Sequence, residues 1–210
     1  MTQAMTRPRS AEATKARILG AAKQEFARLG FAGARVDEIA EKAQANKRMI
    51  YHYFGSKEML FQLVLEEAYL DIRSAEQALK LDDLPPLEAL EKLVTFTWQY
   101  YLDNPEFITL VNSANLHRAK HIAESTKLPA SSQKLNQMVQ NILGRGVEDG
   151  VFRPSVDALQ LNITIAAVGY YYLTNRHTGA VLFERDYMDP KALDERLAFN
   201  VETILRLVRA

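Results

Sequence analysis

The chain has 210 residues, of which 48% are hydrophobic and 25% are charged, and its formal net charge is zero. This composition is ordinary for a soluble protein and supplies enough apolar residues for a real core. Cysteine is absent, which excludes disulfide bonds and thiolate metal sites and suits the reducing cytoplasm where we expect the protein to act.

The zero net charge hides an uneven distribution. Residues 1–57 contain eleven Lys/Arg and five Asp/Glu, a net charge of +6, whereas residues 58–210 contain fifteen and twenty-one, a net charge of −6. This distribution indicates a small basic part attached to a larger acidic part, and we expect the basic part to bind phosphate groups.

Neither a secretory signal nor a membrane span is predicted. The N-terminal stretch MTQAMTRPRSAEATKAR is polar and basic and lacks an apolar segment. Residues 158–175 carry no formal charge and approach the length of a transmembrane helix, but amides and hydroxyls interrupt them. We therefore expect a buried or interfacial helix there and no membrane partner.

Four helices are expected in the first eighty residues. The first covers about 11–29 and ends at Gly30, which suits a helix C-terminus. The second carries apolar residues at i, i+3, i+4 and i+7 from Val36. Asn46 is a typical N-cap for a third helix over 47–54, and Ser56 caps a fourth that extends to about residue 79.

The segment LDDLPP at 81–86 breaks the helical pattern because two prolines follow one another. Further helices are predicted at about 86–103, 105–125, 130–149, 156–181 and 190–209. The sequence has neither a convincing strand nor an internal repeat. The predicted fold class is all-α.

The stretch NKRMIYHYFGSK, residues 46–57, has two different faces when it is placed on a helical wheel. Lys47, Arg48, Tyr51 and His52 share the outward arc, whereas the opposite arc carries the following residues: Met49, Ile50, Tyr53 and Phe54. Only three or four residues separate this helix from the preceding one, which is the helix-turn-helix arrangement that places its second helix in the DNA major groove. The outward face combines groups that bind phosphates and base edges.

Residues 15–61 resemble the DNA-binding domain of TetR-family transcriptional regulators. The matching features are as follows: Ile18, Ala21, Ala22, Phe26, Gly30, Phe31, Ile39, Ala40, Tyr51, Tyr53, Phe54, Ser56, Lys57, Glu58 and Leu60. The resemblance implies an all-helical homodimer whose N-terminal three-helix DNA-binding domain is joined by a long helix to a larger ligand-binding and dimerisation domain. It also implies a repressor that a small ligand releases from DNA.

The expected organisation is a flexible basic arm over residues 1–10, a DNA-binding domain over 11–57 with the helix-turn-helix at about 35–54, and a second domain over 58–210. The family pattern places phosphate or base contacts on seven residues: Arg35, Lys47, Arg48, Tyr51, His52, Tyr53 and Lys57. Arg7 and Arg9 are expected to reach a minor groove.

Two positions depart from the family's usual pattern. Gln44 stands where a glycine is common, and keeping a left-handed conformation there costs about 1 kcal/mol. Arg35 replaces a hydroxyl residue before the second helix, so a side-chain cap is lost and a cation is gained.

An effector pocket is predicted from the aromatic and amide residues between 96 and 117, together with one later tyrosine, because small-molecule sites are apolar cavities with few polar anchors. The residues chosen are Trp98, Tyr101, Phe107, Asn112, Asn115, His117 and Tyr171. Ordinary core packing is the competing interpretation for each. The segments NPEFITLVNSANLHRAKHI and YYYLTNRHTGAVLFERD resemble a TetR subgroup linked to the breakdown of aromatic or N-heterocyclic compounds, which suggests such an effector.

No catalytic residues are predicted, because no nucleophile, base and orienting group can be assembled. His117 and His121 have i, i+4 spacing with Glu124 beyond them, but a fourth metal ligand is absent, so we expect neither a metal site nor a fixed cofactor.

The last two long helices, about 157–181 and 191–209, suit a four-helix dimer interface. Their apolar stripes include Leu161, Ile165, Leu197, Val201 and Ile204. A single copy that exposed both stripes would have a large apolar patch, so pairing is expected.

The sequence therefore predicts a dimeric repressor of a palindromic DNA operator that responds to a small-molecule effector. Two alternatives stay open: a helical ligand-binding or interaction protein whose basic part engages an acidic protein, and a helical metal enzyme that uses His117 and His121.

Overall fold

The computed structural model describes residues 11–210, so the predicted basic arm, with Arg7 and Arg9, lies outside the described residues. Within that range the chain forms ten α-helices and one short 3-10 helix, without a named β-strand. The chain divides into two compact units. Unit 1 contains residues 11–67 and 109–124, and unit 2 contains residues 68–108 and 125–210.

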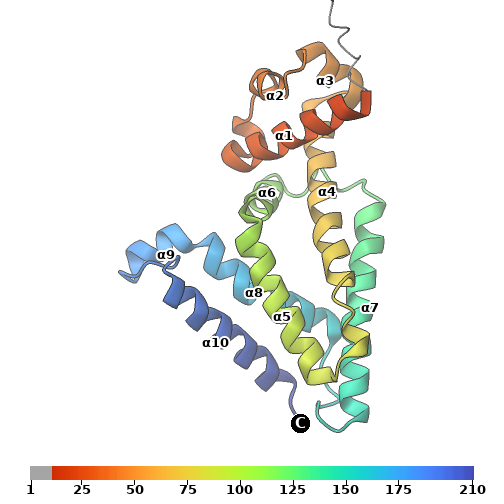
Figure 1. Ribbon diagram of the computed structural model, residues 1–210, viewed down its shortest axis with the longest axis vertical. Helices are drawn as coiled ribbons and strands as arrows, with labels where there is room; N and C mark the ends of the chain where they lie inside the picture. The colour runs from red at the N-terminus through yellow and green to blue at the C-terminus, as the bar shows by residue number, and fades with distance from the viewer. Residues whose placement is uncertain (1–10) are drawn as a thin grey trace, which may run out of the picture. The chain divides into compact units, whose positions relative to one another are not determined.

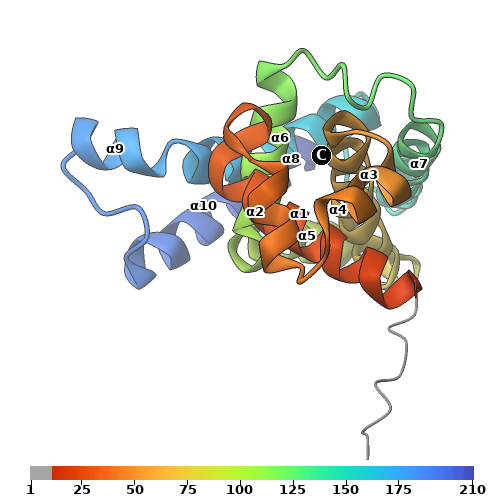
Figure 2. The same cartoon turned by 90° about the horizontal axis from the view of Figure 1, so that it is seen from above.

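Unit 1 begins with α1 (Ala11–Gly33), α2 (Val36–Lys42) and α3 (Lys47–Phe54), which are followed by the first half of α4 (Lys57–Gln77) (Figures 1 and 2). The end of α6 (Pro105–Leu116) and the turns after it complete the unit. Gly30 bends the last part of α1 because its φ is +66°, a conformation open to glycine.

The core of unit 1 is built from apolar side chains of α1 to α4. Phe26 and Phe61 are fully buried, and their rings meet edge to face with 4.9 Å between centroids. The Glu25 carboxylate is buried in the same unit, where it pairs with Lys42 of α2 and Arg28 of α1. The Lys42 hydrogen bond is the main cause that lowers the pKa of Glu25, so this ion pair fastens α2 to α1.

A second segment, residues 109–124, is fastened to unit 1 through Phe31. The backbone N–H of Phe31 donates to Ser113 Oγ at 2.9 Å. The Phe31 ring also lies against His117 and His121, with centroid separations of 5.3 and 4.2 Å. Unit 1 is therefore assembled from two stretches that are distant in sequence.

Unit 2 contains the 3-10 helix η1 (Leu81–Asp83), α5 (Pro86–Asp103), α7 (Lys127–Glu148), α8 (Ala158–Thr174), α9 (Arg176–Leu182) and α10 (Pro190–Val208). Helix α5 packs against α7, α8 and α10, which makes it the centre of the unit. Helix α9 projects beyond α5 and α7 at the joint between α8 and α10 (Figures 1 and 2).

Leucine, isoleucine and valine side chains from η1, α5, α7, α8 and α10 fill the core of unit 2. Arg145 of α7 ties down the turn before α5 by donating to the carbonyl oxygens of Leu81 and Leu84 at 3.0 and 2.7 Å. Gly146 lies beside the fully buried Phe152, and an added Cβ would stand 1.9 Å from Cδ2 of that ring.

The structure differs from the predicted helices at two places. The helix expected over 105–125 ends at Leu116, because Arg118 and Ala119 adopt positive φ values of 57° and 55° that no α-helix continues. The helix expected over 156–181 is divided at Asn175, whose φ and ψ are −100° and 12°. The helices at 86–103 and 47–54 have the predicted bounds.

The unit boundaries and the apolar stripes also differ from expectation. The boundaries fall inside α4 and α6 rather than at residue 57, since residues 109–124 pack with the first helices. Leu161, Ile165 and Ile204 lie in the core of their own chain. A different set is exposed on α8 and α10: Leu159, Ile163, Tyr171, Phe199 and Leu207.

Replacing Gly146 with alanine is expected to lower the free energy of unfolding of unit 2 by about 2–3 kcal/mol, because the new methyl group collides with Phe152. Gly144→Ala in the same helix is the control, since nothing lies within 4 Å of its added Cβ. It should leave stability unchanged or raise it by up to about 1 kcal/mol. Urea unfolding followed by the fluorescence of Trp98 measures both, and equal effects would contradict the packing argument.

Candidate nucleic-acid interface

The turn between α2 and α3 is short and sharply bent. Gln44 has a φ of 50°, so it adopts the left-handed conformation for which the family commonly has a glycine at this position. The backbone N–H of Ala45 donates to the carbonyl of Ala40 at 2.9 Å and closes the turn. Asn46 then caps α3, because its side-chain oxygen accepts from the N–H of Arg48 at 2.9 Å.

Helix α3 has one buried face and one exposed face. Ile50 is 1% exposed and Phe54 is 6% exposed, so these two side chains hold the helix on unit 1. The exposed residues are Lys47, Arg48, Tyr51 and His52. The division agrees with the helical wheel and leaves two cations, a phenol and an imidazole side by side.

Two residues near α2 modify the charge of this face. Arg35 is exposed at the N-cap of α2, where its side chain makes no capping hydrogen bond. Lys47 Nζ lies 2.8 Å from Asp37 Oδ1, and the hydrogen bond to this carboxylate raises the pKa of Lys47. Asp37 therefore holds a cation that would otherwise be available to a phosphate.

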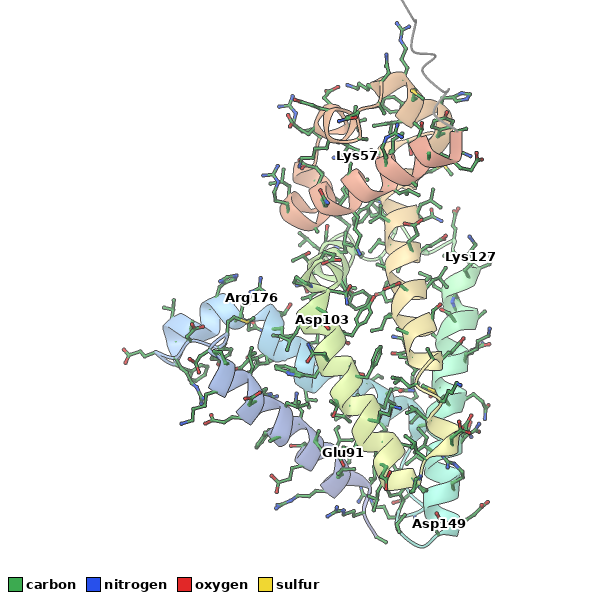
Figure 3. All side chains as sticks on the ribbon, viewed as in Figure 1. Lys57, Glu91, Asp103, Lys127, Asp149 and Arg176 are labelled. Atoms are coloured by element: carbon green, nitrogen blue, oxygen red, sulfur yellow. The ribbon has the colours of Figure 1, made fainter. Side chains whose placement is uncertain are left out.

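Lys57 and Tyr53 lie at the edge of the exposed face. Lys57, which is labelled in Figure 3, is the first residue of α4. Its Nζ stands 4.8 Å from the centroid of the Phe31 ring. Tyr53 is half-buried, with Lys15 Nζ 5.5 Å from its ring centroid and the His52 ring 5.2 Å away. All seven residues predicted for DNA contact thus belong to unit 1 and have at least part of their surface exposed.

The seven predicted pocket residues are divided between the two units. Asn112, Asn115 and His117 belong to unit 1, and both asparagines are exposed. Trp98 and Phe107 are buried in aromatic contacts of unit 2, whereas Tyr171 is 68% exposed. Tyr101 lines a small cavity of unit 2. Amphipathic spacing identified aromatic residues but did not show which of them face a cavity.

The paired histidines serve packing in unit 1. His117 and His121 lie with ring centroids 5.7 Å apart, and both contact Phe31. Burial is the main cause that lowers the pKa of His121. Among residues 11–210 no group of three His, Cys, Asp or Glu side chains could hold a metal ion.

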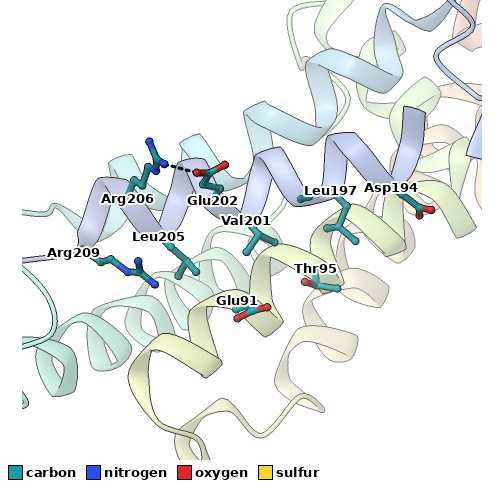
Figure 4. A pocket seen from close by; sticks show the side chains of 10 residues that line it. Glu91, Thr95, Asp194, Leu197, Val201, Glu202, Leu205, Arg206 and Arg209 are labelled. Carbon is teal, nitrogen blue, oxygen red and sulfur yellow. Dashed lines mark ion pairs between the residues drawn. The ribbon is translucent and has the colours of Figure 1, made fainter. Parts of the chain in front are cut away.

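Unit 2 has hollows of several sizes. An open groove of about 690 Å³ lies between α5 and α10 (Figure 4). Two much smaller cavities share Arg73 and Glu76 of α4. The sequence interpretation missed this pair, although two charged residues three positions apart on the core-facing side of a helix are a recognisable signal for buried polar chemistry.

Over the described part of the chain, no helix is long and apolar enough to cross a membrane.

Unit 1 presents a capped helix with a cationic and aromatic exposed face, preceded by a tight turn and a short helix. This arrangement defines the class of helix-turn-helix DNA-binding transcriptional regulators.

The chain belongs to the TetR family. Residues 18–64 match the family model for bacterial regulatory proteins of the tetR family, and residues 86–204 match the model for the Tetracyclin repressor-like C-terminal domain. The HTH-type transcriptional repressor NicS of Pseudomonas putida is 38% identical over 97% of this chain and 96% of its own length. The HTH-type transcriptional repressor SCO4008 of Streptomyces coelicolor is 33% identical, over 76% of this chain and 78% of its own.

Solved structures agree with this assignment. The putative transcriptional regulator SCO4942 of Streptomyces coelicolor superposes with a TM-score of 0.71 at 26% identity, covering 93% of this chain and 98% of that chain. A tetR-family regulatory protein of Rhodococcus RHA1 superposes with a TM-score of 0.72 at 23% identity, over 96% of this chain and 99% of that chain, and so shares the fold.

Asp37→Asn is expected to strengthen binding to random duplex DNA by about two- to fivefold. The substitution frees Lys47 and should steepen the dependence of affinity on salt by about one unit. Fluorescence anisotropy at several salt concentrations measures both quantities. Glu41→Gln removes one exposed negative charge from the same helix and is the control. If it strengthens binding as much as Asp37→Asn does, net charge rather than release of Lys47 is responsible.

Proposed function

We propose that this regulator is a repressor that binds a palindromic operator as a homodimer and leaves it when a small effector binds unit 2. The observation that carries the proposal is the exposed face of α3, where Lys47, Arg48, Tyr51 and His52 stand together on a helix anchored from behind. Membership of the TetR family and the printed names of two relatives, both transcriptional repressors, support it.

On DNA, the residues of unit 1 divide into two roles. Arg48, in the leading turn of α3, suits bidentate recognition of a guanine, because a guanidinium matches O6 and N7. Arg35 and Lys57 sit at the N-termini of α2 and α4, where a cation and backbone N–H groups together bind phosphate. Lys47, Tyr51, His52 and Tyr53 supply the remaining contacts along the groove.

The dimer is proposed to form through α8 and α10. Ile163 and Phe199 are more than half exposed on these helices, and Leu159 and Leu207 add to the apolar surface. Monomeric soluble proteins rarely expose a large contiguous apolar patch, so a second copy of the chain is the natural cover. Two copies then offer two α3 helices to successive major grooves about 34–36 Å apart.

Effector control follows from linkage between the two binding events. A small molecule that binds unit 2 more tightly in the DNA-free state lowers DNA affinity by that difference in binding free energy. No resident cofactor or enzymatic step is proposed, and the site of action is the cytoplasm. An aromatic or N-heterocyclic metabolite is the proposed class of effector.

The alternative, a basic unit that binds an acidic protein, makes a different prediction about salt and sequence. Several phosphate contacts demand a steep loss of DNA affinity between low and moderate salt. A flat response, or equal affinity for random duplex and for every genomic fragment, would favour that alternative over the repressor.

Arg48→Ala is expected to lower the preference for the selected operator over random duplex by about 1–3 kcal/mol. Lys57→Met should weaken both DNAs equally, because it removes a phosphate contact while its apolar stem still covers Phe31. Binding isotherms on both duplexes measure these effects.

Lys120→Met is the control for the change at Lys57. Lys120 also lies over Phe31, at 5.9 Å, but comes from the turns after α6. It should leave DNA affinity nearly unchanged. Equal losses for Arg48→Ala on both DNAs would refute the assignment of base recognition to Arg48.

Ile163→Glu is expected to weaken dimerisation at least about 100-fold, since it places a charge from each copy in an apolar interface. Sedimentation velocity over a concentration series measures the dissociation constant. Leu116→Glu makes the same change at a side chain of unit 1 that is 80% exposed and should leave the dimer intact. A dimer of undiminished affinity in Ile163→Glu would place the interface elsewhere.

A further inference from the structure

Two small cavities in unit 2 meet at the same three side chains. The first, about 30 Å³, lies between α4, α5, α7 and α8, and the second, about 40 Å³, lies between α4 and α7. Arg73, Glu76 and Leu135 line both. Lys134 and Gln77, which are both exposed, line the second cavity, so it leads from the surface toward the pair.

Glu76 is a buried acid with unused hydrogen-bonding capacity. Its side chain is 4% exposed, and its Oε2 lies 2.9 Å from Nη1 of Arg73. That contact lacks hydrogen-bond geometry, so Oε2 has no hydrogen-bond partner in the described part of the chain. Burial raises the pKa of Glu76 to about 7, against the opposing influence of Arg73.

Stability alone is a weak reason to keep this pair. A buried ion pair gains little over well-packed apolar side chains of similar size, because removing two charges from water offsets their attraction. A buried carboxylate oxygen that makes no hydrogen bond and belongs to a cavity-lining residue calls for an explanation, and a polar ligand provides one. The rest of the first cavity is uncharged: Leu93, Ile165 and the buried Tyr101 are on its walls, and Thr97 and Asn162 add polar side chains.

The pair sets the chemistry of a ligand. When it is ionised, Glu76 presents a carboxylate acceptor next to the guanidinium donors of Arg73, so the ligand that matches this form presents a donor next to an acceptor. An N–H beside a carbonyl group, the cis-amide of a ring, has this arrangement. An anionic ligand would satisfy Arg73 but face repulsion from an ionised Glu76.

We propose that Arg73 and Glu76 are the recognition pair of the effector site and that the effector is a small uncharged ring compound carrying a cis-amide. The inference deepens the proposed function and rests on it for the link to DNA. Cavities that hold a benzene-sized ring in proteins measure about 150 Å³, so the ligand must join the two cavities by displacing Leu135, which lines both. Binding thereby changes the packing of Leu135 of α7 against α4.

The larger groove between α5 and α10 fits a ligand less well. It is open, and charged side chains line it along its length: Glu91, Asp194, Glu202, Arg206 and Arg209 (Figure 4). Glu202 and Arg206 already satisfy each other in an ion pair. It also runs along α10, which the proposed dimer uses.

The test uses the full chain and 2-pyridone as the probe, titrated by ligand-observed NMR. N-methyl-2-pyridone is the matched control compound, because it keeps the ring and carbonyl but lacks the N–H. Wild-type protein is expected to bind 2-pyridone saturably and the N-methyl compound at least tenfold more weakly. Equal binding of the two, no saturable binding of 2-pyridone, or tighter binding of benzoate would overturn the proposal.

Variants locate the site. Glu76→Gln is expected to weaken 2-pyridone binding at least fivefold, and the double variant Arg73→Met, Glu76→Met should abolish it while keeping a melting temperature at or above that of the wild type. Glu91→Gln makes the same chemical change in the α5–α10 groove and should have no effect. Loss of binding in Glu91→Gln but not in Glu76→Gln would place the ligand in the groove instead.

Measurements of DNA binding distinguish a failure of this inference from a failure of the proposed function. The double variant should bind a genome-selected duplex as tightly as the wild type does and no longer release it when 2-pyridone is added. If wild-type protein selects no duplex, the repressor proposal fails whatever the NMR result. If it selects a duplex but 2-pyridone leaves Arg73 and Glu76 unengaged, the inference fails alone.

Discussion

The hydrogen bond from the Phe31 amide to Ser113 Oγ is the interaction on which the composition of unit 1 depends. It joins the residue after the kink at Gly30 to α6. His117 and His121, which follow α6, pack against the ring of Phe31. The surface of α3 is therefore supported by residues far along the chain as well as by the buried ion pair of Glu25 with Lys42. A DNA-binding helix needs such a rigid support, because its side chains must meet base edges in one register.

Local sequence predicted unit 1 well for a physical reason. The caps at Asn46 and Ser56 and the left-handed turn at Gln44 are short-range devices, and each is found in the structure. The exposed face of α3 also follows from one helix alone, since residues that share a face are separated by fixed steps in sequence. What could not be seen was the joining of residues 109–124 to this unit, because a contact across 82 positions leaves no periodic signal.

In unit 2, the sequence predicted most of the helices but not the packing of their side chains. It did not show which apolar face of α8 and α10 points inward, because both helices carry apolar residues on more than one side. The cavities draw residues from four helices, and their polar pair comes from α4, outside the aromatic region that composition favoured. A pocket forms where side chains of separate helices leave space unfilled, and the residue pattern of one helix cannot predict where that happens.

The joining of two distant stretches in unit 1 has a consequence for synthesis. A ribosome releases the chain from its N-terminus, so α1 to α3 emerge long before the segment that supplies Ser113 and His121. Until residue 124 is available, the ring of Phe31 lacks its cover and the amide of Phe31 lacks its acceptor. The DNA-binding unit therefore completes its packing only after more than half of the protein has been made, when residues 68–108 of unit 2 already exist and residues 125–210 do not.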